Sequence, residues 1–313
     1  MGLDYNALKL LLWGKNLGVS FERTLTLGRQ NLLCTRRQIS QLTQVFGTPL
    51  DSTQIEHCVP LGEMRAIYAD KLLEALGAKE LVSVDYSDFE GASLIHDLNQ
   101  RFPEHERERY SLVIDGGTLE HVFDFPSAFR NCLELLAVGG HYLATTPAHG
   151  EMGHGFYQFS PELFFRVFST EHGFELRKIV LYNPSKVNAP FYQVHDPANT
   201  GFRNQLKCSH PMTLAVLAQR VNTKPILAAA PMQSDYVASW KQTRQQSGKT
   251  PARDGFMRRL RLRLNPYWPD WLRRIKSKWQ YRKSYGNPTL SNRRDYQLLA
   301  NEEIFRERMS PRI

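Results

Sequence analysis

Cysteine is scarce in this chain, and no two cysteines form a Cys-x-x-Cys pair. Only four are present, at widely spaced positions: Cys34, Cys58, Cys132 and Cys208. Two of them, Cys34 and Cys132, fall in or beside predicted helices. The pattern favours buried free thiols in a reducing compartment over disulfides.

Long apolar runs are missing as well. No run approaches the roughly 18 residues that a transmembrane helix needs. The first residues show no basic region followed by an apolar run and a small-residue cleavage site, and Asn6 stands where a myristoylation signal has Ser or Thr. We therefore expect a cytoplasmic protein.

Several catalytic signatures do not occur in the sequence. There is no P-loop, no Gly-x-Ser-x-Gly nucleophile elbow and no HExxH zinc motif. A metal site could be assembled only from residues without a metal-motif spacing, namely Asp115, Glu120, His121, His149 and His154. This alternative is the weaker one, and we predict no metal.

Basic residues are crowded near the end of the chain. Lys and Arg outnumber Asp and Glu by 40 to 31 overall, for a net charge of +9. Residues 241–313 hold 19 basic and 6 acidic residues, which leaves 21 basic and 25 acidic in residues 1–240. The pattern predicts an acidic α/β domain over residues 1–223 and a basic, partly helical extension over residues 224–313.

Short apolar runs alternate with helical patterns through the first domain. Seven runs are predicted strands: 21–27, 80–84, 92–95, 110–115, 141–145, 174–182 and 212–221. Five segments are predicted helices: 4–15, 35–46, 63–76, 125–136 and 161–168. The alternation predicts an α/β fold with a mostly parallel seven-stranded sheet and helices on both faces. Residues 47–60 are predicted as a loop, residues 183–211 as an ordered loop on the substrate side, and residues 296–306 as a short helical patch.

The stretch from Tyr110 to Pro147 is the clearest unit of the sheet. It runs strand, loop, helix, Gly139-Gly140 turn and strand, at the lengths that a parallel crossover requires. Its polar residues follow the carboxyl end of the first strand. Ligands of open α/β sheets bind at that edge.

Acidic residues stand at the ends of three consecutive predicted strands. Asp85, followed by Tyr86, closes the second strand, where an acid accepts hydrogen bonds from ribose hydroxyls. Asp97 closes the third and could accept the exocyclic amine of adenine, with Leu98 as an apolar contact. Asp115 and Gly116 follow at the next strand. Together they predict a nucleoside-binding edge.

The segments VIDGGTLEHVFD and LLAVGGHYLATTP resemble the fourth strand, the following acidic stretch and the Gly-Gly turn of class I S-adenosylmethionine-dependent methyltransferases. GHGFYQFSPELFFRVF is similar to a subset of these proteins. The resemblance covers about residues 21–221. It implies a seven-stranded sheet with its last strand antiparallel, S-adenosyl-L-methionine as cofactor, and methyl transfer to a small-molecule or membrane-linked acceptor.

The chain departs from that family at the end of the first strand. The family has a glycine-rich loop there, whereas this chain has Gly28-Arg29-Gln30. Arg29 could hold the cofactor carboxylate or an anionic substrate. The alternative is a non-catalytic binding module with a degenerate cofactor site. The residues predicted to bind the cofactor are Gly28, Arg29, Gln30, Asp85, Tyr86, Asp97, Leu98, Asp115, Gly116 and Glu120.

Methyl transfer requires an acceptor aligned with the sulfonium methyl, and a general base only where the acceptor must lose a proton. The predicted catalytic residues are His121, His154 and Tyr157, with His149 as a further candidate. Each of the histidines has a purely structural alternative, and Glu120 is either an orienting group or a first-turn helix acid.

Tryptophans stand among arginines and lysines in residues 255–282. This composition suits peripheral contact with an anionic membrane surface, such as the inner membrane face. Nucleic acid is a less favoured partner. A third interpretation is packing of the tail on the body or on a partner subunit.

Overall fold

The computed structural model describes residues 2–62, 66–246, 269, 271–272, 274–275 and 288–308, with backbone only for 241–246. The chain forms two compact units. The first contains residues 1–194, 208–231 and 298–313, and the second contains residues 195–207 and 232–297. The predicted domain boundary at 223 remains a prediction. Within the described part of the chain, no helix has the length and apolar character needed to cross a bilayer.

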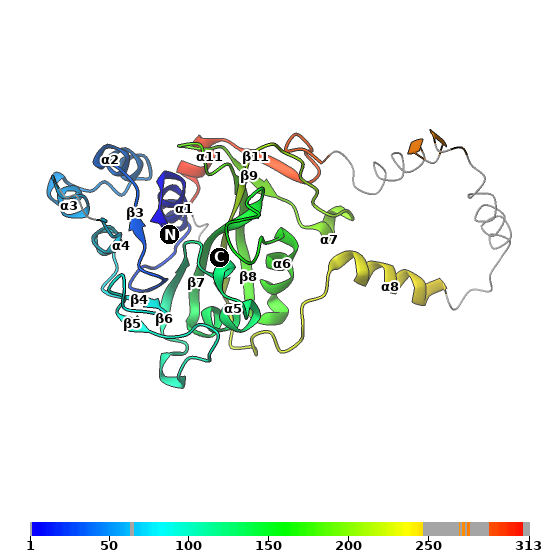
Figure 1. The fold of residues 1–313 in the computed structure, drawn as a ribbon, viewed down its shortest axis with the longest axis horizontal. Coiled ribbons are helices and arrows are strands. Elements are labelled where there is room, and N and C mark those ends of the chain that lie inside the picture. Colours follow the sequence, from blue (N-terminus) through cyan, green and yellow to red (C-terminus); the bar gives the residue numbers. More distant parts are fainter. Residues whose placement is uncertain are drawn as a thin grey trace. The chain divides into compact units, whose positions relative to one another are not determined.

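A nine-stranded sheet organises the fold, in the order β11-β9-β8-β10-β7-β6-β2-β4-β5 (Figure 1). Its strands are β2 (Arg23–Leu27), β4 (Glu80–Asp85), β5 (Leu94–Ile95), β6 (Tyr110–Asp115), β7 (Leu136–His149), β8 (Phe174–Tyr182), β9 (Phe191–Val194), β10 (Met212–Arg220) and β11 (Tyr296–Leu299). A separate two-stranded parallel sheet joins β1 (Gly2–Leu3) to β3 (Asn31–Leu32).

Strand directions confirm the predicted mostly parallel sheet. Strands β5, β4, β2, β6 and β7 are successively parallel. Strand β10 lies between β7 and β8 and is antiparallel to both. All seven predicted strands are present, and the last of them is the antiparallel one, as the resemblance implied.

The predicted strand count of seven was wrong, because the sheet has nine strands. Strand β9 lies inside the predicted loop 183–211 and pairs antiparallel with β8. Strand β11 occupies the start of the predicted helical patch 296–306, whose remainder is helix α11 (Asn301–Arg306). Both strands have four residues, too few to give a clear period-two pattern.

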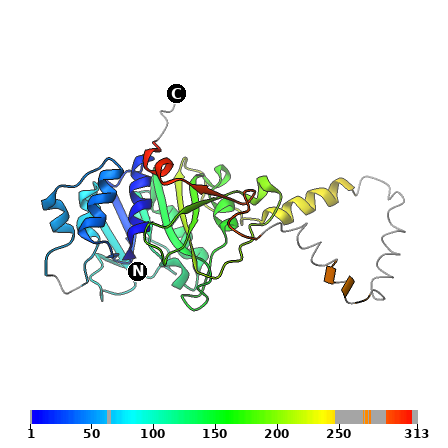
Figure 2. The ribbon, with the colours of Figure 1, turned by 90° about the horizontal axis from the view of Figure 1, so that it is seen from above.

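Helices cover both faces of the sheet (Figures 1 and 2). Tyr142 and Leu143 are consecutive in β7 and therefore point to opposite faces. Leu143 belongs to the core that includes α1 (Tyr5–Asn16), α2 (Arg36–Val45) and α4 (Asp70–Ala75). Tyr142 packs in an aromatic cluster with α5 (Phe125–Glu134) and α6 (Pro161–Val167).

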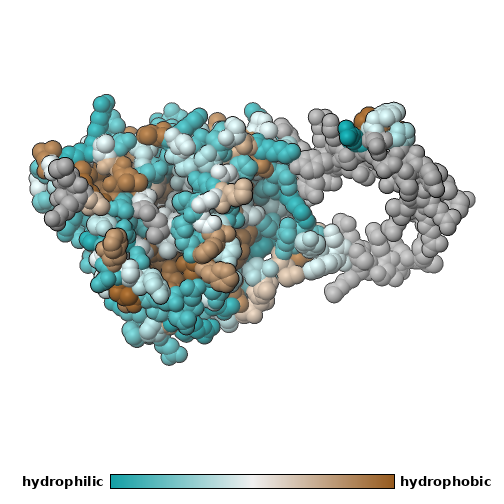
Figure 3. Space-filling view, in the orientation of Figure 1, coloured by the Kyte–Doolittle hydropathy of each residue, from teal (hydrophilic) through white to brown (hydrophobic). Residues whose placement is uncertain are grey.

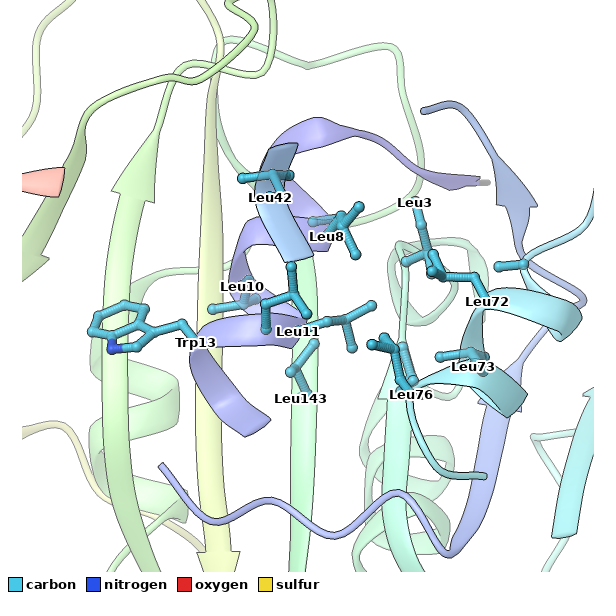
Figure 4. Packing of buried hydrophobic residues seen from close by; sticks show 14 of the residues in the cluster. Leu3, Leu8, Leu10, Leu11, Trp13, Leu42, Leu72, Leu73, Leu76 and Leu143 are labelled. Carbon is cyan, nitrogen blue, oxygen red and sulfur yellow. The ribbon is translucent and has the colours of Figure 1, made fainter. Parts of the chain in front are cut away.

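Helix α1 lies at the centre of the first face. Asp4 caps it by accepting a 2.8 Å hydrogen bond from the backbone N–H of Ala7. The helix is buried on nearly all sides, as expected for a helix enclosed by a core. Figure 4 shows its leucines against Leu42, Leu143, the α4 leucines Leu72 and Leu73, and Leu76 at the C-cap of α4.

Three other predicted boundaries differ from the structure. The predicted loop 47–60 contains helix α3 (Ser52–Cys58), which begins with a capping box at Asp51. Within the predicted helix 63–76, the described residues 66–69 are not helical and α4 begins at Asp70, since Tyr68 forms a β-bridge with Asn31. Strand β7 also begins earlier than predicted and includes Gly139 and Gly140.

The second unit contains α7 (Pro197–Thr200) and α8 (Ser234–Gln246). Arg203, which follows α7, forms an ion pair with Asp235 in the first turn of α8. Arg294 lies 3.9 Å from the centre of the Phe202 ring. The predicted membrane-binding segment 255–282 falls almost wholly outside the described residues.

Candidate functional site at the carboxyl edge of the sheet

The carboxyl ends of β2, β4 and β6 lie in register, next to β7, which continues to His149. Leu27 of β2 pairs with Val84 of β4 and with Asp115 of β6, which in turn pairs with Ala144 of β7. The residues that follow these positions therefore begin at one edge of the sheet. The residues predicted from the sequence to bind a ligand were expected at this edge.

The turn after β2 is built around Gln30. Gly28 has φ of +70°, which favours glycine, and its N–H donates to the carbonyl of Val84 at 2.7 Å. The buried Gln30 amide donates to the Leu27 carbonyl at 2.6 Å. Its oxygen, Oε1, is buried without a hydrogen-bond partner among the described residues. A Cβ on Gly116 would lie 2.1 Å from this oxygen, so Gly116 leaves the space that Gln30 fills.

The guanidinium of Arg29 contacts three neighbouring residues. Its Nε and Nη2 donate to Oδ2 of Asp70 at 2.9 and 2.6 Å. Nη1 donates to the Glu90 carbonyl at 3.1 Å, and the guanidinium lies 4.1 Å from the centre of the Tyr68 ring. Arg29 therefore connects the turn after β2 to α4 and to the loop after β4.

Asp85 at the end of β4 and Asp97 after β5 differ in the hydrogen bonds that their carboxylates accept. Asp85 is half-buried, and its Oδ1 accepts from the N–H of Tyr86, whose side chain is 76% exposed. Asp97 accepts two hydrogen bonds from Asn99, at 2.9 and 2.7 Å, and these bonds lower the pKa of Asp97. Leu98 is buried beside it.

Asp115 is enclosed within the protein. Its Oδ1 accepts from the N–H groups of Gly117 and Thr118, at 3.2 and 2.8 Å, and its Oδ2 accepts from the hydroxyl of Tyr142 at 3.0 Å. Burial raises the pKa of Asp115, and these hydrogen bonds oppose the rise. Asp115 thus fixes the turn that carries the next candidates, Glu120 and His121.

Glu120 is buried, with 1% of its surface exposed. It lies in a 3-10 turn, Leu119–His121, and its Oε2 accepts from the Thr146 hydroxyl at 3.3 Å. Burial, and next the charge of Asp115, raise the pKa of Glu120 to about 8. Its backbone carbonyl accepts from the N–H groups of Phe156 and Tyr157, which ties this turn to the loop after β7.

That tie brings His154 to Glu120 and His121. Nε2 of His154 lies 3.6 Å from Oε1 of Glu120, and the two imidazole centroids are 5.1 Å apart. Both histidines are exposed. Burial, and then the nearby His154, lower the pKa of His121.

The two remaining catalytic candidates have other partners. Tyr157 donates its hydroxyl hydrogen bond to the Phe123 carbonyl at 2.7 Å. The His149 Nε2 lies 3.3 Å from the Cys208 carbonyl oxygen. Of the five residues considered for a metal site, the structure brings together Glu120, His121 and His154, and His149 is not among them.

The loops that follow these strands carry an apolar rim, of which sequence reasoning named Tyr86 and missed the other members. Five large side chains there are more than two thirds exposed: Tyr86, Phe89, Phe123, Met152 and Phe156. Phe123 and Phe156 form an edge-to-face pair with centroids 6.1 Å apart. Figure 3 shows apolar patches between hydrophilic ones on the viewed face of the molecule. Exposed aromatic pairs such as Phe123 and Phe156 mark contact surfaces, and their position after predicted strands was the available signal.

No protein-family model and no curated protein matches this chain. Solved structures do resemble it. An S-adenosylmethionine-dependent methyltransferase from Mesorhizobium loti matches with a TM-score of 0.34 and 16% identity, over 69% of this chain and 98% of that one. Geranyl diphosphate methyltransferase in complex with SAM matches with a TM-score of 0.36 and 12% identity, over 69% and 85%.

The [4+2]-cyclase SpnF matches equally well, with a TM-score of 0.36 and 12% identity over 71% of this chain and 82% of that one. Because all three TM-scores lie below 0.5, nothing about this chain's chemistry follows from these likenesses. The strand order and the residues at the sheet edge are the informative features.

Proposed function

We propose that this chain transfers a methyl group from S-adenosyl-L-methionine to an acceptor bound at the carboxyl edge of the sheet. The observation that carries the proposal is the register of β2, β4 and β6, which aligns Leu27, Val84 and Asp115. It brings Gly28, Asp85 and Gly116 to one edge of a sheet in which the antiparallel β10 lies between β7 and β8. Nucleosides bind at such an edge in open α/β sheets.

The residues present fit this cofactor in two respects. The buried Oε1 of Gln30 is an acceptor without a partner among the described residues, and it suits the ammonium group of the cofactor. Oδ2 of Asp85 accepts no hydrogen bond within the described residues, and it suits a ribose hydroxyl. Asp97 and Leu98 are the candidates for the adenine. When bound, the cofactor supplies an electrophilic methyl group on a sulfonium.

The chain's own contribution is to hold the acceptor and exclude water. Phe123 and Phe156 give an apolar rim, while Glu120, His121 and His154 give polar groups beside it. Aligning an acceptor with the methyl group supplies much of the rate in such reactions. We assign the acceptor to this side of the edge.

Calorimetric titration with S-adenosylmethionine and its demethylated product tests the proposal. We expect saturable binding of both. Asp85→Asn should weaken it about tenfold or more, because a hydrogen bond to a charged group contributes about 1.5–3 kcal/mol. Asp88→Asn, an exposed acid in the same loop, is the matched control and should bind normally. No heat at millimolar cofactor would reject methyl transfer.

One observation favours a second function, a binding module without catalysis. Arg29 is held by Asp70, Glu90 and Tyr68 in the turn where the family has its glycine-rich loop. Under this alternative neither cofactor form binds, and Arg29→Gly does not create binding. If Arg29→Gly binds cofactor where the natural chain does not, the site is intact but blocked by this side chain.

A further inference from the structure

The three side chains that meet after β6 and β7 form a constellation of metal-ligand type. Glu120 contributes a carboxylate, and His121 and His154 each contribute an imidazole. One ligand atom from each residue lies within 4.8 Å of the other two. Two imidazoles and one carboxylate are a common ligand set for divalent transition-metal ions.

The distances between the ligand atoms are close to those around a bound metal ion. Ligand atoms that are each about 2.0–2.2 Å from a tetrahedral ion lie roughly 3.3–3.6 Å from one another. Nε2 of His154 is 3.6 Å from Oε1 of Glu120. The histidine side chains are exposed and can rotate to shorten the remaining distances, whereas the carboxylate is fixed by burial and by Thr146.

Glycines leave room around the carboxylate. Gly117 has φ of +98°, and a Cβ there would lie 3.1 Å from Oε1 of Glu120. A Cβ on Gly155 would lie 2.8 Å from the Glu120 carbonyl oxygen, so a larger residue would push the loop that carries His154 away. The approach of His154 to Glu120 therefore depends on glycine at position 155.

Two other acids lie near Glu120. The charges of Asp115 and Glu151 act on it. Neither imidazole is used in a hydrogen bond to another described residue, so their nitrogen lone pairs are not committed within the described part of the chain. A buried carboxylate in this position is more stable when it is paired with positive charge.

We propose that Glu120, His121 and His154 bind one divalent transition-metal ion, with coordination positions open to solvent on the exposed side. This goes beyond the proposed methyl transfer and does not depend on it. If both hold, the ion would lie on the acceptor side, where it would lower the pKa of a bound acceptor hydroxyl so that the proton passes to solvent water and not to a protein base. An imidazole that binds the ion is then a ligand and not a general base.

The test uses the full-length, untagged protein and the metal alone. Titration with Co²⁺, followed by its visible absorption, and calorimetric titration with Zn²⁺ should each give one equivalent of tight binding. Glu120→Gln and His154→Gln should each weaken binding at least tenfold, and should reduce the Co²⁺ absorption that nitrogen ligands produce. His154 is exposed, so its replacement leaves the fold intact even if Glu120→Gln does not fold.

His149→Gln is the matched control, because His149 is the last residue of β7 and contacts Cys208 instead of the cluster. It should bind one equivalent with unchanged affinity. The proposal is overturned if the natural chain shows no saturable binding, or if His154→Gln and His149→Gln bind equally well. Cofactor titration in the presence of a chelator is a separate readout, so loss of metal binding and loss of cofactor binding can be told apart.

Discussion

The side chain of Gln30 occupies the volume in which a side chain at Gly116 would lie. The Gln30 amide is folded back on the turn after β2, and its oxygen occupies the position where any side chain at Gly116 would begin. The two residues lie in the turns that follow the neighbouring parallel strands β2 and β6. Their interaction therefore joins the turn that should contact a cofactor to the turn that carries Glu120.

Gly116→Ala tests this shared space. The added methyl must displace the Gln30 side chain, and we expect a loss of about 1–3 kcal/mol in the free energy of unfolding. Gln30→Ala removes the obstacle, so the double variant should lose at least ~1 kcal/mol less than the sum of the single changes. Urea unfolding of the four proteins measures this coupling. If the losses of free energy in the two single variants simply add in the double variant, the contact between Gln30 and Gly116 is contradicted.

His141 should make the stability depend on pH. It is buried in β7, Nδ1 has no partner among the described residues, and burial lowers the pKa of His141 to about 4. The unfolded chain, with an ordinary pKa of about 6.5, binds this proton first as the pH falls. Stability contributed by neutral His141 is therefore complete above pH ~6.5 and is lost towards pH ~4, by on the order of 3 kcal/mol.

His141→Gln removes the titrating group. Its unfolding free energy should decrease less between pH 7 and pH 4.5 than that of the natural chain, measured by urea unfolding at both values. His105→Gln is the control, because His105 is 76% exposed, and it should retain the natural dependence. If the unfolding free energies of all three proteins fall equally between pH 7 and pH 4.5, His141 does not cause the pH dependence.

Helix α11 should stabilise the first unit although it lies near the end of the sequence. Ile304 is 1% exposed and belongs to the main core, and Glu307 accepts a 2.9 Å hydrogen bond from the Trp13 indole. We expect Ile304→Ala to cost about 2–4 kcal/mol. Leu298→Ala, at a side chain 58% exposed, should cost less than ~0.5 kcal/mol. Thermal unfolding of both variants checks the difference, and equal losses would argue against this packing.

The sheet could be predicted because its signals are local. The strand that ends at Asp115 is a run of apolar residues followed by two glycines, and the actual β6 has the predicted bounds. Asp85 ends β4, one residue beyond the predicted strand 80–84, where the apolar run stops. Parallel strands align their carboxyl ends, so these local boundaries were enough to locate the candidate edge.

The features that were not predicted depend on contacts distant in sequence. The Tyr68 bridge to Asn31 shortens a helix whose pattern alone extends further. The His154 approach to Glu120 arises from backbone hydrogen bonds between two loops, which no periodicity encodes. The engagement of Arg29 by Asp70 likewise joins residues from separate turns.

The antiparallel insertion has a consequence for biosynthesis. Strand β10, Met212–Arg220, is made after β7 and β8 but must enter between them. Until it emerges from the ribosome, β7 and β8 have no strand between them, and each presents an unpaired edge that can recruit other chains. We expect nascent chains that end before residue 212 to depend on chaperones, and release of the antiparallel strand to be the event that lets the sheet close.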